Sequence, residues 1–235
     1  ALVFSAMRHF AADLRDAGRE VIYIGLTDPE NSQSLVGEVE RLQAAHQFDA
    51  WCVTEPGEWR LKTDFESLAS RIPVPFEICP DERFICSHEE FNEFLKGRKQ
   101  PRMEHFYRRI RQSTGLLMDG KDPAGGQWNF DHDNRKKYKG DPPIPRRPAQ
   151  TLDESEINLI EQISKIFPDD FGDINPQIYP LDKKSAETLW SHFLDNHMMF
   201  FGPYQDAMKS HEPFLFHSLM SPAINLGIID PRTLL

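Results

Sequence analysis

Strand-like and helix-like patterns alternate along the first 95 residues of this chain, whereas beyond Thr151 only helical patterns remain. Apolar runs rich in β-branched residues predict strands at 21–26, 50–55 and 74–79, and residues 1–4 have the pattern of a strand already under way. Strands that alternate with helices through short connections favour a parallel sheet wrapped by helices. The expected fold class of this region is therefore α/β.

The helices between these strands have recognisable start signals. Ser5 is placed to cap the first helix, and Ser87 with Glu90 three residues later forms a capping box. Pro75 places the strand that contains it at a sheet edge, because proline donates no backbone hydrogen bond. The helices expected in this region lie at 5–18, 35–45, 57–68 and 87–95.

The carboxyl-terminal part of the chain has a different pattern. A basic amphipathic helix is expected at 101–112, after which periodicity is absent from 113 to 150. Pro142-Pro143-Ile144-Pro145 favours an extended strap between domains. Further helices are expected at 151–167, from 183 or 185 to 200, and at 213–226. We therefore expect an α/β domain at 1–112, an interdomain loop at 113–150 and part of an all-helical domain at 151–235.

Charge is distributed unevenly along the chain. Residues 96–147 hold fourteen Lys and Arg against six Asp and Glu, a net charge of +8, while the whole chain has a net charge of −10. Cations interleaved with aromatic rings suit a nucleic acid, because cations neutralise phosphates and rings stack on bases. A solvated, disordered linker is the alternative. The candidate nucleic-acid contacts are Trp128, Phe130, Arg135, Lys136 and Lys137.

Composition restricts the cellular setting. The sequence is 39% hydrophobic and 27% charged, as in ordinary globular proteins, and no apolar run approaches the ~20 residues that span a bilayer. Three cysteines outside any C-x-x-C pair favour a reducing compartment over a cysteine-ligated metal site. We expect a cytoplasmic, monomeric protein that is a fragment of a longer chain.

Familiar catalytic patterns are absent from the sequence. No G-x-G-x-x-G or phosphate-loop pattern follows the expected strands, and no G-x-S-x-G elbow occurs. Glu55 and Glu58, at a strand-to-helix corner, suit either hydrogen bonds to a ring's N–H edges or an ordinary first helical turn. Asp131, in Asp131-His132-Asp133, is a candidate metal ligand, with a solvated acidic turn as the alternative.

Polar residues interrupt the apolar run near the carboxyl end. Ser218 and Ser221 either bond to the preceding helical turn or, with backbone N–H groups at a helix start, receive a phosphate. Pro222 allows a helix to begin at about Ser221.

Several long segments together resemble the photolyase-related proteins, and more narrowly the iron–sulfur bacterial cryptochromes and photolyases, a prokaryotic (6-4) photolyase branch. The resemblance covers the whole chain, and the segments occur in the same order. These segments are 4–10, 53–60, 115–118, 126–131 and 217–222.

The resemblance implies an antenna domain, an interdomain loop and a helical domain that holds FAD. Residues 217–222 are similar to the Thr-Ser-x-Leu-Ser-Pro run with which photolyases hold the FAD diphosphate, although His217 departs from the Thr. Tyr204 corresponds to a position near the flavin. A lumazine (6,7-dimethyl-8-ribityllumazine) is the implied antenna. The implied cofactor contacts are Val3, Tyr204, Glu55, His217, Ser218, Leu219, Met220 and Ser221.

The implied activity is light-driven repair of pyrimidine photoproducts in UV-damaged DNA by electron transfer from reduced FAD, with the (6-4) product expected. Blue-light signalling without repair and cofactor-free nucleic-acid binding are the alternatives. Asp131 is also a candidate for an ion or lesion contact. We expect the first antenna strand before Ala1, and the rest of the flavin cradle with the four 4Fe–4S cysteines after Leu235. We therefore expect the 235-residue chain alone to hold FAD poorly.

Overall fold

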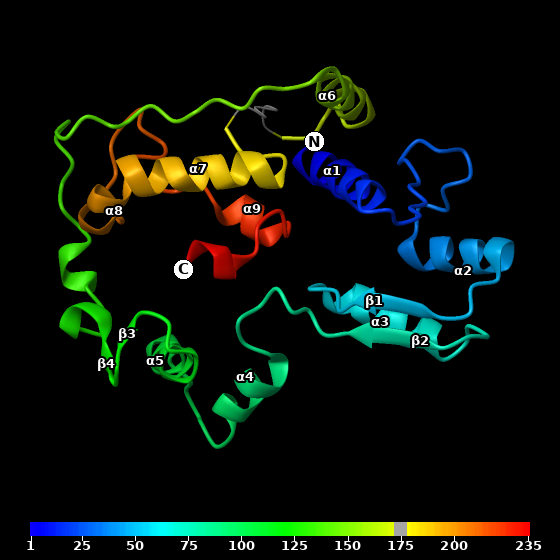
Figure 1. The fold of residues 1–235 in the computed structure, drawn as a ribbon, viewed down its shortest axis with the longest axis horizontal. Coiled ribbons are helices and arrows are strands. Elements are labelled where there is room, and N and C mark those ends of the chain that lie inside the picture. The colour runs from blue at the N-terminus through cyan, green and yellow to red at the C-terminus, as the bar shows by residue number, and fades with distance from the viewer. Residues whose placement is uncertain (172–177) are drawn as a thin grey trace. The chain divides into compact units, whose positions relative to one another are not determined.

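The computed structural model describes residues 1–171 and 178–235 (Figure 1). The chain divides into two compact units, one formed by residues 20–97 and the other by residues 1–19 together with 98–235. No helix among the described residues has both the length and the apolar character needed to cross a membrane. The expected domain limits at 112 and 150 stay predictions.

The unit of residues 20–97 contains a small parallel sheet. Strand β1 (Trp51–Thr54) pairs with β2 (Phe76–Cys79) in parallel, with Trp51 opposite Phe76 and Thr54 opposite Cys79. Pro75 immediately precedes β2, and its carbonyl oxygen accepts a hydrogen bond from the Trp51 N–H at 2.8 Å. The predicted parallel pairing of these two strands is confirmed, and the mixed helix and parallel-sheet character agrees with the α/β class.

The helices of this unit lie close to the expected ranges, and α4 begins at its predicted signal. Ser34 caps α2 (Leu35–His46), and α3 (Trp59–Ala69) follows the turn at Gly57. Ser87 and Glu90 form the predicted capping box at α4 (His88–Leu95), with distances of 3.2 Å and 3.0 Å for the two hydrogen bonds. Leu68 is fully buried, and Phe65 packs against Phe76 of the sheet.

Two predicted strands are wrong. Residues 21–26 form no strand, and the Ile22 side chain is 44% exposed. The carbonyl oxygens of Gly25 and Leu26 accept hydrogen bonds from the side-chain amides of Asn31 and Gln33, so this run makes loop contacts in place of a sheet ladder. An apolar run alone does not supply the partner that a strand requires.

The strand expected at 1–4 is instead the start of helix α1 (Leu2–Asp16). Ser5 lies inside this helix, where it is buried, and it is not the cap. A short apolar run fits a helix as well as a strand, and only its packing decides between them. The contact that distinguishes them here joins α1 to α6 (Glu154–Ile166): His9 Nε2 lies 3.0 Å from Glu156 Oε1.

Residues 98–150 contain the basic helix and a loop with little regular structure. Helix α5 (Met103–Thr114) ends at Gly115, whose positive φ of 73° suits glycine. A two-residue hairpin follows, formed by β3 (Met118–Asp119) and β4 (Asp122–Pro123). Two short 3-10 turns, η1 (Ala124–Gly126) and η2 (Asp131–Asp133), lie beyond it.

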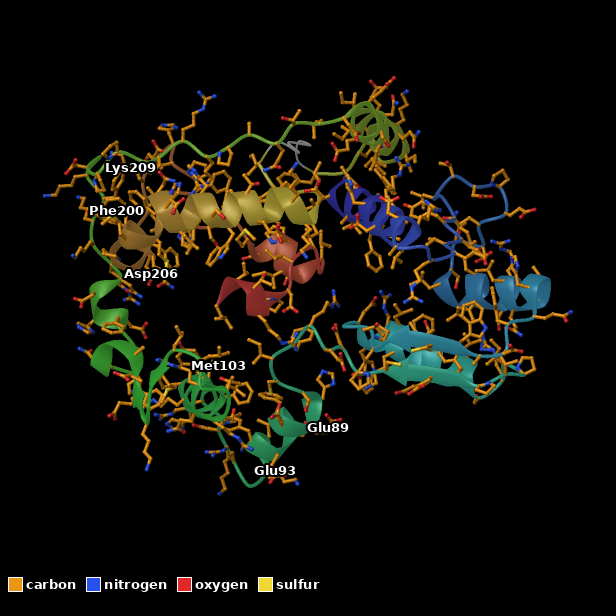
Figure 2. All side chains as sticks on the ribbon, in the orientation of Figure 1. Glu89, Glu93, Met103, Phe200, Asp206 and Lys209 are labelled. Atoms are coloured by element: carbon orange, nitrogen blue, oxygen red, sulfur yellow. The ribbon has the colours of Figure 1, made fainter. Side chains whose placement is uncertain are left out.

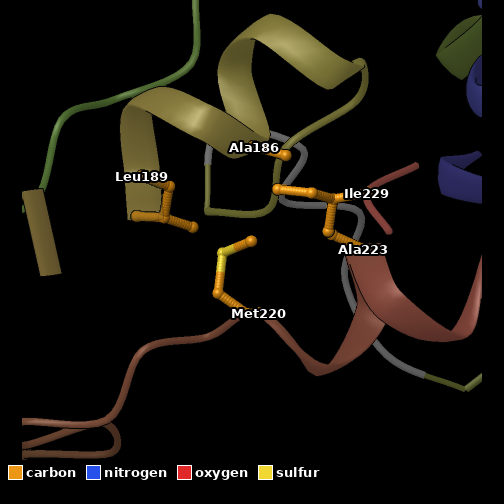
Figure 3. Close-up of a cluster of buried hydrophobic side chains, with 5 residues drawn as sticks. All are labelled: Ala186, Leu189, Met220, Ala223 and Ile229. Atoms are coloured by element: carbon orange, nitrogen blue, oxygen red, sulfur yellow. The ribbon is translucent and has the colours of Figure 1, made fainter. Parts of the chain in front are cut away.

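The region beyond 150 is helical, as predicted. Asp153 and Asp182 cap α6 and α7 (Lys183–Asn196). The helix expected to run on to Phe200 is divided at His197, where α8 (Met198–Tyr204) begins a new segment. Met220, Ala223 and Ile229 pack beneath α7 on its buried residues Ala186 and Leu189 (Figure 3).

The long apolar helix expected at 213–226 is wrong. Only α9 (Ser221–Asn225) is helical there, followed by the 3-10 turn η3 (Pro231–Leu234). Leu215 and Leu219 have positive φ values of 39° and 60°, which are incompatible with a right-handed helix. The start at Ser221, with Pro222 in the first turn, agrees with the prediction.

Candidate cofactor and nucleic-acid sites

The polar residues near the carboxyl end lie in an irregular turn at 213–220 that leads into α9. Arg147, which is distant in sequence, contacts this turn. It lies in the proline-rich strap, which continues from residue 142 to residue 149. Its Nη2 donates to the carbonyl oxygen of Leu215 at 3.0 Å and to that of His217 at 2.7 Å. The guanidinium also lies 5.8 Å from the ring centroid of Phe214, and burial lowers the pKa of Arg147. In a helix these two carbonyl oxygens would accept hydrogen bonds from backbone N–H groups. Here the Arg147 guanidinium is the donor instead.

A cluster of aromatic side chains packs against the turn. Phe216 is fully buried and contacts the rings of Phe200, Tyr204 and Tyr138. The Tyr138 hydroxyl donates to the Pro142 carbonyl oxygen at 2.8 Å, so the strap and the turn share one apolar support.

Two of the predicted cofactor residues, Tyr204 and His217, lie close to this cluster. The centroids of the Tyr204 and Phe216 rings are 5.4 Å apart with the planes tilted by 31°, and the Tyr204 hydroxyl is 3.4 Å from the Asp141 carbonyl oxygen. His217 Nε2 lies 2.9 Å from the Gln205 carbonyl oxygen, which requires Nε2 to carry the proton and donate. The structure therefore brings the turn and the end of α8 together.

The two serines occupy different surroundings at the end of the turn. Ser218 is half-buried, and its hydroxyl oxygen accepts a hydrogen bond from the Met220 N–H at 3.4 Å. Ser221 is exposed at the first position of α9. Met220 points into the hydrophobic core beneath α7 (Figure 3), so its side chain is not available to a ligand, and Leu219 is half-buried.

A groove of about 680 Å³ runs between the strap and the turn. The strap lines it from 143 to 149, and Lys209, Phe214 and Leu219 line it from the other side. Among the described residues of this lining, Arg146, Arg147 and Lys209 outnumber the acid Glu212. Such a groove favours an anionic group over a cation.

His197 was not predicted as a functional residue, although it lies at the centre of this region. Its side chain is 1% exposed, and neither ring nitrogen has a hydrogen-bond partner in the described part of the chain. It packs against the rings of His192, Phe193 and Phe216. Burial, together with the nearby charges of Arg147 and His192, lowers the pKa of His197 to about 4. No local sequence pattern distinguishes it from a surface histidine.

The basic segment presents its predicted nucleic-acid residues unequally. Trp128 is half-buried, with the guanidinium groups of Arg108 and Arg111 at 5.2 Å and 5.4 Å from its ring centroid. Arg111 is itself buried and donates to the carbonyl oxygen of Leu117. The Trp128 indole therefore stacks on two arginines of the chain itself. The Phe130 ring, by contrast, is 49% exposed to solvent.

The cations that follow Phe130 face solvent. Lys136 and Lys137 are exposed, and Arg135 Nε lies 3.3 Å from Asp206 Oδ2, just after α8 (Figure 2). The backbone beneath them is fixed, since the Lys136 N–H donates to the Pro203 carbonyl oxygen at 3.0 Å. This fixed backbone presents the charges in one place.

Asp131, the candidate metal ligand, is exposed in η2. The neighbouring ion pair joins His132 Nε2 to Asp133 Oδ2 at 3.1 Å. Within residues 1–171 and 178–235, no group of three or more His, Cys, Asp or Glu residues is arranged to hold a metal ion. The role of Asp131 stays a prediction.

The two remaining cofactor candidates belong to different compact units. Val3 is 51% exposed on α1. Glu55 follows β1, and its carboxylate accepts a hydrogen bond from the Lys62 ammonium, which holds the pKa of Glu55 below its usual value. His88 Nδ1 lies 3.5 Å from the same carboxylate. Glu55 thus lies at the carboxyl end of the sheet, as predicted, and pairs with a residue of α3.

Comparison with known proteins identifies the family. The family model for deoxyribodipyrimidine photo-lyase-related proteins matches residues 1–179. The chain belongs to this family. A relative described as a (6-4) photolyase, from Agrobacterium fabrum, is 41% identical over 230 residues. This match covers 98% of the chain but only 45% of the relative, so the chain spans about half of the relative's length.

A second relative of this photolyase-related chain matches only a short segment. An uncharacterized protein of Acanthamoeba polyphaga mimivirus is 50% identical over 32 residues, which is 14% of the chain and 25% of that protein.

The turn of this photolyase-related chain carries side chains that suit a flavin diphosphate. The hydroxyls of Ser218 and Ser221 are hydrogen-bond donors of the kind that a diphosphate accepts from. The three cysteines, which all lie in 20–97, are too few for a four-cysteine cluster. The donor set therefore fits FAD, and it does not fit a 4Fe–4S cluster.

Proposed function

We propose that this chain is the amino-terminal part of a FAD-dependent photolyase that repairs (6-4) photoproducts in UV-damaged DNA. Family membership and 41% identity to a (6-4) photolyase over 98% of the chain carry this proposal. Reduced FAD supplies the light-excited electron that breaks the lesion's bonds. The residues of this chain bind the FAD, orient it and shield it from solvent.

The proposed flavin contacts are the turn at 217–221 and Tyr204. The Ser218 and Ser221 hydroxyls donate to the diphosphate, and Arg147 keeps the turn in place through the carbonyl oxygen of His217. His217 acts through its hydrogen bond to Gln205, which orients the turn against the end of α8.

DNA is proposed to bind over the basic segment. Lys136 and Lys137 neutralise phosphates, and Phe130 contacts bases of the duplex opened by lesion flipping. Trp128 is proposed to hold the loop through its two arginines and does not contact bases directly. Asp131 is proposed to contact an ion or the lesion from the adjoining turn.

The unit of residues 20–97 is proposed as the antenna domain. A lumazine is its proposed chromophore, with Glu55 at the carboxyl end of β1 accepting from the N–H edges of the ring. Val3 of α1, which belongs to the other unit, stays a predicted cofactor contact. The cysteines of a 4Fe–4S cluster are proposed to lie outside the residues of this chain. We propose a cytoplasmic monomer.

Repair of a synthetic duplex that contains one (6-4) lesion tests the proposal on the intact protein. Loss of the lesion under blue light and not in darkness is the expected result. A flavin photocycle without repair would instead support a blue-light receptor, and DNA binding by a protein without flavin absorbance would support a cofactor-free nucleic-acid-binding protein.

The flavin contacts have their own test. The double variant Ser218→Ala/Ser221→Ala should lose at least tenfold in FAD affinity, because it removes two hydrogen bonds to a charged group. Ser210→Ala removes an exposed serine outside the turn and should bind FAD normally. Equal FAD content in both variants, at equal helicity by circular dichroism, would show that the diphosphate lies elsewhere.

A further inference from the structure

The groove between the strap and the turn has two kinds of lining. Ile144, Pro145 and Phe214 are half-buried and give the groove apolar walls. Arg146 and Lys209, by contrast, are exposed, and Lys209 lies beside the strap (Figure 2). A ligand that suits both parts of the lining combines an apolar ring with an anionic group.

The charged groups of the groove suit a phosphate. The described residues of its lining include the cations Arg146, Arg147 and Lys209 and the acid Glu212, a net charge of +2. Arg147 uses Nη2 for two carbonyl oxygens of the turn. Within the described residues its Nε and Nη1 make no hydrogen bond, so these donors are available to a ligand. Guanidinium groups bind phosphate oxygens through paired N–H donors, and an ammonium group adds a point charge.

The apolar walls suit a nucleobase. Phe214 provides an aromatic ring from the side of the turn, and Ile144 and Pro145 provide apolar surface from the side of the strap. Bases stack on aromatic side chains through their flat faces, with little dependence on which base it is. The ring and the phosphate sites are therefore present in one groove.

The size of the groove favours a single nucleotide over a strand. Its volume of about 680 Å³ falls within the range of roughly 300–1,000 Å³ that is usual for small-molecule sites. A single strand instead occupies about 4–16 nucleotides on a binding domain. A phosphate monoester also has a charge of about −1.5 to −2 near neutral pH, which balances the charge of the lining.

We propose that this groove binds a free nucleoside monophosphate. The phosphate lies on Arg146, Arg147 and Lys209, and the base lies between Phe214 and the strap. This ligand goes beyond the proposed repair activity, which uses a flavin and damaged DNA.

The groove is distinct from the proposed serine contacts of FAD. Leu219 of the turn lines the groove, whereas Ser218 and Ser221 are not among the described residues that line it. A nucleotide in the groove therefore leaves both serine hydroxyls to the FAD diphosphate. We expect the two ligands to bind at the same time.

Isothermal titration calorimetry with AMP on the intact, FAD-loaded protein tests the proposal. We expect one AMP to bind per chain in addition to FAD. Ribose 5-phosphate lacks the base and adenosine lacks the phosphate, so each should bind at least tenfold more weakly than AMP. Absence of AMP binding would overturn the proposal. Binding of AMP only to flavin-free protein would also overturn it, because the groove would then belong to the flavin site.

Two double variants show where AMP binds. Arg146→Ala/Lys209→Ala removes two exposed cations of the groove and should lower AMP affinity at least tenfold, with FAD content and helicity unchanged. Lys165→Ala/Lys184→Ala removes exposed cations of α6 and α7 and is the matched control, which should bind AMP normally. Equal AMP affinity in the two double variants would contradict the proposal. So would a groove variant that weakens binding of a single-stranded oligonucleotide and leaves AMP affinity unchanged.

Discussion

Arg147 Nη2 lies 2.7 Å from the carbonyl oxygen of His217, a residue 70 positions further along the chain. The same nitrogen also reaches the carbonyl oxygen of Leu215. One strap side chain therefore determines the conformation of the turn that leads into α9.

Removing Arg147 should destabilise the unit that contains the turn. Arg147→Ala leaves two backbone carbonyls without their charged donor, and we expect a loss of about 2–3 kcal/mol in the free energy of unfolding. Urea unfolding followed by circular dichroism measures it. The exposed neighbour Arg146 is the control, and Arg146→Ala should change stability by less than about 0.5 kcal/mol. Equal losses in the two variants would contradict the role given to Arg147.

His197 should make stability depend on pH. Its pKa is about 4 in the folded chain, below the ordinary histidine value near 6.5, so the unfolded chain binds more protons between these values. Stability is therefore present above pH 6.5 and is lost as the pH falls toward 4. We expect a loss of about 2 kcal/mol between pH 7 and pH 5.

A histidine substitution isolates this effect. His197→Phe keeps the apolar packing with Phe216 and removes the titrating group, so the stability loss between pH 7 and pH 5 should shrink by most of its size. His105→Gln changes an exposed histidine and should retain the full loss. Urea midpoints at the two pH values measure both variants. An unchanged pH dependence in His197→Phe would assign the loss to other groups.

The exposed lysine pair after Phe130 should contribute to DNA affinity. Lys136→Glu/Lys137→Glu should lower the slope of log affinity against log salt by up to about 1.8, because each phosphate contact contributes about 0.9. Fluorescence anisotropy with a labelled duplex measures this slope. Lys183→Glu/Lys184→Glu, at the start of α7 and outside the basic segment, is the matched control. The same decrease in both double variants would indicate a general charge effect.

A titration should detect the ion pair between Glu55, which follows β1, and Lys62. The Lys62 ammonium holds the pKa of Glu55 below the ordinary glutamate value, so the pair stabilises the fold above that value and is lost as the pH falls through the lowered pKa. Carboxyl carbon NMR of Glu55 should show the lowered pKa, and Lys62→Met should return it toward the ordinary value. Lys96→Met, which removes a partner of Glu93, should leave Glu55 unchanged.

Local signals in the sequence located most of the helices and the pairing strands. Ser87 and Glu90 predicted α4 because a capping box is made within four residues and needs no distant partner. Strands β1 and β2 were also recognised from their own apolar runs. The start of helix α9 at Ser221 was predicted from Pro222 alone.

Segments that depend on distant partners were misassigned. Residues 1–4 fit both a helix and a strand, and contact between α1 and α6 separates these possibilities. The apolar run at 21–26 lacks the neighbouring strand that would complete it. The run at 213–226 has helical composition, yet Leu215 and Leu219 adopt positive φ values.

The sequence by itself determined the family, the concentration of positive charge in 96–147 and the residue types of the turn at 217–222, because each is a property of neighbouring residues. Only the tertiary structure decided that Arg147 holds that turn and that His197 is buried with no hydrogen-bond partner among the described residues. Both features depend on residues remote in sequence. Their energies come from burial and from hydrogen bonds that form only after the chain has folded.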